Sequence, residues 1–184
     1  MMFVQTQETP NPNSLKFLPG KPVSNSGSYE VKKKDITNNS LIKNILSING
    51  VTGIFLGSDF ISVNKEKEVN WEDIKHIVIS LINEYYNLGK KFVINEELNE
   101  IKPRENLIEI EKEIIKILDT KIRPAVAKDG GDIKFKEFKD GIVKVELQGS
   151  CSGCPSSIMT LKQGVQNLLC HYISDVKEVV AVQE

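Results

Sequence analysis

The sequence predicts an α+β protein made of two small domains joined by a linker. Several segments alternate apolar and polar residues, as strands with one buried face do, and longer segments repeat apolar residues at helical spacing. A charged stretch with little periodicity separates two groups of such segments. With 184 residues, the chain is long enough for two domains. We expect an N-terminal domain over residues 1–90, a linker over 91–105 and a C-terminal domain over 106–184.

The N-terminal domain is expected to fold as one compact unit of strands and two helices. Two prolines in a polar segment separate the first two strands and indicate a hairpin-like opening. Asn39 or Ser40 is a suitable N-cap for the first helix and Asn70 for the second, which Gly89 ends. The expected strands are 2–9, 15–18, 29–31, 51–56 and 60–63, and the expected helices are 41–48 and 71–88.

The C-terminal domain is expected to follow a helix-strand-strand-helix-strand order. Its first helix covers 105–122 and ends at Pro124, because proline cannot continue a helix from within. Asp140 and Gly141 predict a two-residue hairpin turn between the two strands. The second helix begins near Pro155. A last strand over 176–182 closes the domain.

Composition excludes several classes of protein. The net charge is −1 and neither half of the chain is basic, so we expect no nucleic-acid partner. Three cysteines are too few for a disulfide-stabilised secreted scaffold. No apolar run approaches the ~18 residues of a membrane span, so no membrane association is expected. The first residues resemble neither a signal peptide nor an arginine-rich transit peptide, which favours a reducing cytoplasm.

Cys151 and Cys154 form a Cys-x-x-Cys motif where an alternating strand pattern gives way to a helical one. The N–H groups and the dipole at a helix N-terminus favour negative charge, so we predict a lowered thiol pKa. Thiolates attack disulfides or bind soft metals. The motif is therefore predicted to perform either redox or metal chemistry.

One chain does not supply a complete set of metal ligands. Cys170 lies 16 residues beyond Cys154, about 24 Å along a helix, and is expected to pack rather than ligate. His171 is expected to be a solvated residue at the helix end, and Asp129 and Asp132 to form a turn rather than a hard-metal site. Zinc and iron–sulfur sites usually need four ligands, so we predict a dimer around a shared site.

Specific stretches of both halves resemble one family. Residues 107–184 resemble the C-terminal domain of the NifU-like (Nfu-type) iron–sulfur cluster proteins, and residues 2–88 resemble the N-terminal domain of that family. The C-terminal resemblance rests on 129–133, 149–157 and 160–165. The N-terminal resemblance rests on 5–6, 9–17, 50–55 and 57–61.

The resemblance implies a non-enzymatic scaffold or carrier for a [4Fe-4S] cluster. Cys151 and Cys154 would ligate the cluster, which two subunits of a homodimer would share. The implied partners are recipient iron–sulfur apoproteins and upstream cluster assembly proteins. The N-terminal domain would serve partner recognition or dimer geometry. The expected location is a bacterial cytoplasm, with the mitochondrial matrix as the alternative.

Two other functions fit the same cysteines. A thiol–disulfide oxidoreductase would use Cys151 and Cys154 directly, although we expect the element order not to give the βαβ setting of such motifs. A structural zinc dimer would bind metal without transferring it.

Overall fold

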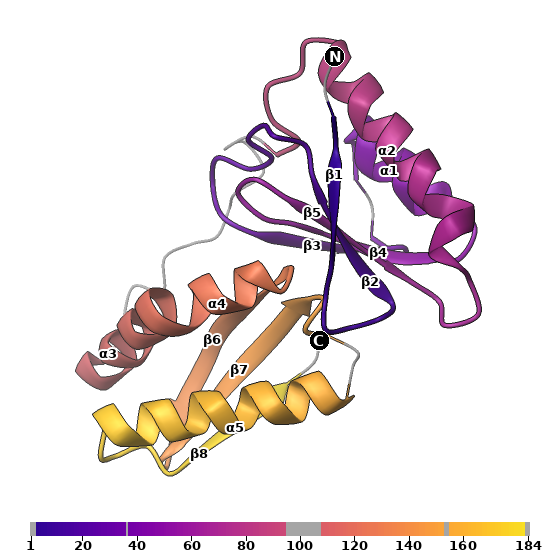
Figure 1. The fold of residues 1–184 in the computed structure, drawn as a ribbon. Helices are drawn as coiled ribbons and strands as arrows, with labels where there is room; N and C mark the ends of the chain where they lie inside the picture. Colours follow the sequence, from indigo (N-terminus) through magenta and orange to yellow (C-terminus); the bar gives the residue numbers. More distant parts are fainter. Residues whose placement is uncertain (1–2, 36, 95–107, 153–154, 183–184) are drawn as a thin grey trace.

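The computed structural model describes residues 3–35, 37–94, 108–152 and 155–182. It contains a five-stranded sheet in the N-terminal domain and a three-stranded sheet in the C-terminal domain, each with helices (Figure 1). The predicted α+β class is confirmed. The predicted bounds of the linker stay a prediction, because most of it, residues 95–105, lies outside the described part. Val93 and Ile94, just before that gap, are buried in the core of the N-terminal domain. No described helix combines the length and apolar character that a membrane crossing requires.

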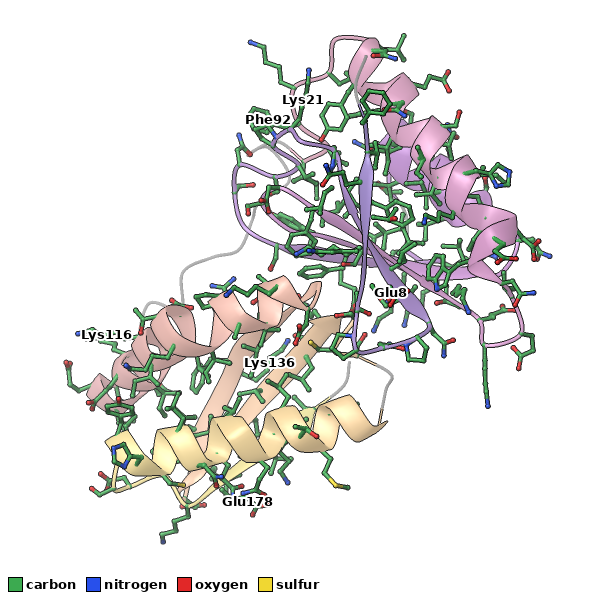
Figure 2. All side chains as sticks on the ribbon, in the orientation of Figure 1. Glu8, Lys21, Phe92, Lys116, Lys136 and Glu178 are labelled. Carbon is green, nitrogen blue, oxygen red and sulfur yellow. The ribbon has the colours of Figure 1, made fainter. Side chains whose placement is uncertain are left out.

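The N-terminal sheet is antiparallel throughout, with the strand order β1-β2-β5-β4-β3. Both helices lie on one side of it (Figure 1), and Figure 2 shows the side chains that fill the space between. The predicted strands and helices of this domain are confirmed to within a few residues. The elements are β1 (Gln5–Glu8), β2 (Ser14–Leu18), β3 (Tyr29–Lys32), α1 (Ser40–Ser47), β4 (Val51–Leu56), β5 (Ile61–Lys65) and α2 (Trp71–Asn87).

Alternation gives this sheet two different faces. In β2 and β5, Phe17, Ile61 and Val63 belong to the hydrophobic core beneath the helices, together with Val78 and Ile82 of α2. The residues between them in sequence must point to the opposite face. The first helix begins as predicted, because the side chain of its N-cap residue, Asn39, accepts a hydrogen bond from the backbone N–H of Ile42.

The C-terminal domain has the predicted order of elements. Asp140 and Gly141 both have positive φ angles, 53° and 85°, as a two-residue hairpin turn requires. The strand order is β6-β7-β8. The elements are α3 (Glu109–Ile117), the π-helical turn η2 (Leu118–Ile122), α4 (Arg123–Lys128), β6 (Gly131–Lys139), β7 (Ile142–Gly149), α5 (Pro155–Tyr172) and β8 (Glu178–Val182).

The prediction that Pro124 ends the first helix is wrong. The chain passes through η2 and then continues as α4 to Lys128. Pro124 lies in the first turn of α4, where its missing N–H costs little because that group has no partner within the helix. The predicted start at residue 105 lies outside the described part of the chain.

The prediction that the cysteine motif lacks a βαβ setting is also wrong. Strand β8 pairs parallel with β7, and α5 makes the crossover between them. The turn from β7 into α5 is the turn that holds the motif. Strand periodicity reveals neither the partner of a strand nor its direction, which is why the sequence did not show this arrangement.

Candidate metal centre

Cys151 follows β7 at a tight crossing of two backbone segments. Gly149 has a φ of +69°, and a Cβ there would lie 2.6 Å from the carbonyl oxygen of Gly130. Across this crossing the Ser150 N–H donates to the Gly130 oxygen over 3.2 Å, and the Ser150 hydroxyl donates to the carbonyl of Asp129. The end of β7 therefore packs against the turn that precedes β6.

The Cys151 side chain is directed into the C-terminal domain and is only 7% exposed. It belongs to the hydrophobic core of that domain. A Cβ on Gly131 would lie 2.8 Å from its sulfur, so the thiol sits directly on the backbone at the start of β6. The Ser150 hydroxyl is 3.9 Å from the same sulfur.

Burial raises the pKa of the Cys151 thiol to about 11, and the negative charges of Asp129 and Asp132 act in the same direction. The hydrogen bond with Ser150 opposes this rise. The prediction of a lowered pKa is therefore wrong for Cys151 in this conformation. The thiol lies four residues before the first residue of α5, Pro155, and is buried in the domain core. In this state it is protonated at neutral pH.

The structure gives different outcomes for the predictions on Cys154, Cys170 and His171. Cys154 lies outside the described residues, so its role stays a prediction. Cys170 is exposed on α5, which makes its predicted packing role wrong. His171 is exposed in the last turn of α5, as predicted. Among the described residues, no group of three or more histidine, cysteine or carboxylate side chains is placed to hold a metal ion.

Asp132 is used for an ion pair, which leaves no hard-metal site there. The Arg123 guanidinium donates to both of its carboxylate oxygens, over 2.7 and 2.8 Å. Burial raises the pKa of Asp132, but the hydrogen bonds from Arg123 and Ser28 outweigh this, and the net pKa is lowered. Asp129 does stand in a turn, as predicted.

An apolar cavity of about 860 Å³ adjoins the cysteine. Ile122 and Val126 line one wall and Leu161 and Val165 of α5 line the other. Cys151 contributes to its lining, and so does a proline of the N-terminal domain, Pro10. The site thus lies where the two domains meet.

The N-terminal domain contacts this loop closely, which the sequence pattern did not indicate. Asn11 donates from Nδ2 to the carbonyl oxygens of Ser150 and Ser152, over 3.1 and 3.4 Å. Glu30 accepts from the Gly149 N–H over 3.0 Å. Its carboxylate also lies 3.3 Å from the Ser152 hydroxyl, whose shorter hydrogen bond, 2.8 Å, is to the Gly149 carbonyl. One signal that could have indicated a contact on this face is the polar residue between apolar neighbours in a strand, such as Glu30 between Tyr29 and Val31 in β3.

Two family models match this chain, one in each domain. The model of the family described as "Scaffold protein Nfu/NifU N terminal" matches residues 4–89, and that of the "NifU-like domain" matches residues 114–180. A solution structure of a NifU-like protein from Saccharomyces cerevisiae is 31% identical with a TM-score of 0.48, over 52% of this chain and 87% of that one.

Two curated relatives match over nearly the whole chain. "NifU-like protein 4, mitochondrial" of Arabidopsis thaliana is 44% identical over 97% of this chain, which spans 65% of that protein's length. "NFU1 iron-sulfur cluster scaffold homolog, mitochondrial" of Homo sapiens is 44% identical over 100% of this chain and 73% of its own length. The chain belongs to the NifU-like (Nfu-type) family.

Proposed function

We propose that this chain is an iron–sulfur cluster scaffold or carrier that binds its cargo through Cys151 and Cys154. The observation that carries the proposal is the similarity along the entire chain to a human protein named an iron–sulfur cluster scaffold homolog. The matching NifU-like domain, residues 114–180, includes both cysteines. Thiolates are the ligands that iron–sulfur clusters use.

The cargo that we propose is a [4Fe-4S] cluster shared by two copies of the chain. Such clusters are usually held by four thiolates, whereas one motif supplies two. The described residues of a single chain hold no group of three ligands that would complete the set. A second copy contributes an identical pair, so a homodimer gives four cysteines around one cluster.

Delivery then follows as an exchange of thiolates. A cysteine thiolate of the recipient apoprotein bonds to an iron as a carrier cysteine leaves, and no electron is transferred in that step. The departing carrier cysteine takes up a proton when it returns to its buried position, because burial there favours the neutral thiol. Upstream assembly proteins supply the cluster by the same exchange in reverse.

A thiol–disulfide oxidoreductase is the second candidate, and the βαβ crossover from β7 to β8 favours it. The raised pKa of Cys151 speaks against it, because a protonated thiol is a poor nucleophile. A structural zinc dimer would use the same ligands without transfer.

For the location, we propose the mitochondrial matrix in preference to a bacterial cytoplasm. The plant and human relatives described above both carry "mitochondrial" in their names.

Anaerobic reconstitution with iron and sulfide tests the function. Mössbauer spectra, iron and sulfide analysis and mass determination on one sample should give about four iron and four sulfide per dimer. Cys151→Ser and Cys154→Ser should each lose the cluster, whereas the matched control Cys170→Ser on exposed α5 should retain it.

Three outcomes would contradict the assignment. A stoichiometric cluster in Cys151→Ser would remove that residue from the ligand set. An iron-free monomer with a reversible disulfide and activity in insulin reduction would favour the oxidoreductase. Zinc in anaerobically purified protein, with no cluster after reconstitution, would favour the structural dimer.

A further inference from the structure

The face of the N-terminal sheet that is not covered by helices lies against the cysteine loop. We call it the docking face. It comprises Lys16, Glu30, Phe55, Phe60, Ser62 and Asn64, together with Asn11 from the turn between β1 and β2.

The docking face fixes the backbone on both sides of Cys151. Before the cysteine, the Gly149 N–H donates to Glu30 and the Ser150 oxygen accepts from Asn11. After it, the Ser152 carbonyl oxygen accepts from Asn11. The Ser152 hydroxyl donates to the Gly149 carbonyl over 2.8 Å and lies 3.3 Å from the Glu30 carboxylate. With both neighbours held, the thiol stays turned into the C-terminal core.

The docking face also holds the turn that crosses beneath the loop. Ser62 is fully buried and donates to the carbonyl oxygen of Gly130 over 2.7 Å. The Lys16 ammonium donates to the carbonyl oxygens of Ala127 and Lys128, at the end of α4, over 3.0 and 3.3 Å. The contacts therefore cover both segments that enclose the thiol.

The centre of the docking face is apolar. Phe55 and Phe60 are 1% and 3% exposed, yet neither belongs to the hydrophobic core of either domain. Their ring centroids are 5.9 Å apart, and Gly149 is so close that a Cβ there would lie 2.9 Å from Phe55. An apolar centre with hydrogen bonds around it is the usual composition of a specific interface.

We infer that the N-terminal domain is an intramolecular cap on the cysteine loop, and that it must undock before Cys151 can bind cargo. A ligand to a cluster shared between two chains has to reach the surface of its own chain, and the docked loop holds this one inside. The identity of the cargo rests on the proposed function, whereas the cap itself does not.

Capping and loading are then linked equilibria. The apparent affinity for cargo equals the intrinsic affinity of the uncapped chain multiplied by the fraction of chains that are uncapped. By reciprocity, bound cargo favours undocking. Undocking exposes Phe55 and Phe60, which gives the loaded carrier an aromatic surface that the cargo-free chain conceals.

Two substitutions separate capping from folding. Asn11→Asp keeps the side-chain oxygen that accepts from the Asn13 N–H, but it replaces the amide donor with a carboxylate facing two carbonyl oxygens. Ser62→Val suits a strand but removes the bond to Gly130 and adds bulk against it. Asn44→Asp is the matched control, because Asn44 is exposed on α1.

The experiment measures alkylation of each cysteine by iodoacetamide in the reduced, cargo-free full chain, resolved by mass spectrometry. Exposed Cys170 is the internal reference. Asn11→Asp and Ser62→Val should each raise the rate at Cys151, relative to Cys170, roughly tenfold, because each removes hydrogen bonds between the docking face and the C-terminal domain. Asn44→Asp should not change the ratio.

An unchanged ratio in both cap variants would overturn the proposal, and so would wild-type Cys151 reacting as fast as Cys170. Amide hydrogen exchange of the wild type adds a test that needs no variant. Slow exchange of the Gly149 N–H supports the docked cap, and exchange at the rate of an open loop contradicts it. Neither measurement uses iron, so both remain valid if reconstitution fails to give a cluster.

Discussion

The two faces of the five-stranded sheet perform different tasks with different interactions. The face beneath α1 and α2 is apolar and packs into one hydrophobic core. The docking face surrounds two phenylalanines with hydrogen bonds to the backbone of the other domain. Burial of large apolar side chains contributes several kcal/mol each, whereas a hydrogen bond contributes ~1 kcal/mol net. One face therefore holds the domain together, and the other is suited to reversible contact.

The largest expected effects come from a matched pair of phenylalanines on opposite faces of the sheet. Phe17→Ala should lower the free energy of unfolding of the N-terminal domain by about 3–5 kcal/mol, because Phe17 is fully buried in its core. Phe55→Ala should leave that unfolding transition nearly unchanged and instead accelerate alkylation of Cys151. Urea denaturation followed by circular dichroism, together with the alkylation assay, separates the two effects.

Equal destabilisation of the domain by both substitutions would break the distinction between the faces. It would mean that Phe55 contributes to the folding of its own domain rather than to docking.

A smaller effect is expected at the crossing beneath the docking face. Gly149→Ala should destabilise the C-terminal domain by at least about 2 kcal/mol, since it combines a positive φ with a Cβ 2.6 Å from a carbonyl oxygen. The control is Gly164→Ala in α5, where nothing lies within 4 Å of the added atom. It should stabilise the helix by about 0.5–1 kcal/mol. Thermal unfolding of the two variants measures both effects, and similar midpoints would contradict the tight crossing.

The smallest expected effect is on how the free energy of unfolding depends on pH in the acid range. The folded-state pKa of Asp132 is lowered, so its stabilising contribution is complete above the ordinary aspartate pKa of about 3.9. It is lost as the pH falls through the lower folded-state value, where the bonds to Arg123 and Ser28 break. Urea unfolding at decreasing pH should show a shallower acid limb in Asp132→Asn than in the wild type. Identical acid limbs would contradict this assignment.

Much of the fold follows from local pattern. The strands of the N-terminal sheet, the cap at Asn39 and the turn at Asp140–Gly141 depend on residues near in sequence, and all were predicted correctly. Pro124 was misjudged because a proline has the same effect on sequence pattern whether it ends one helix or begins the next.

The site was less predictable, because its properties depend on contacts distant in sequence. The pKa of Cys151 is set by its burial against residues 129–132, which no spacing rule reveals. The parallel pairing of β7 with β8 and the docking of Asn11 on the cysteine loop likewise depend on tertiary contacts. The assignment of Cys151 and Cys154 as ligands came from residue type and resemblance, and it remains a proposal.

A loading titration of the wild type and a cap variant tests most directly whether the N-terminal domain restrains Cys151. Iron and sulfide would be added anaerobically at increasing concentrations to the wild type, Asn11→Asp and Asn44→Asp. Absorption would follow cluster formation. If the cap competes with cargo, Asn11→Asp should be half-loaded at a concentration of iron and sulfide roughly tenfold lower than the other two chains require. Half-loading of Asn11→Asp at the same or a higher concentration than the wild type would contradict the claim that the N-terminal domain restrains Cys151.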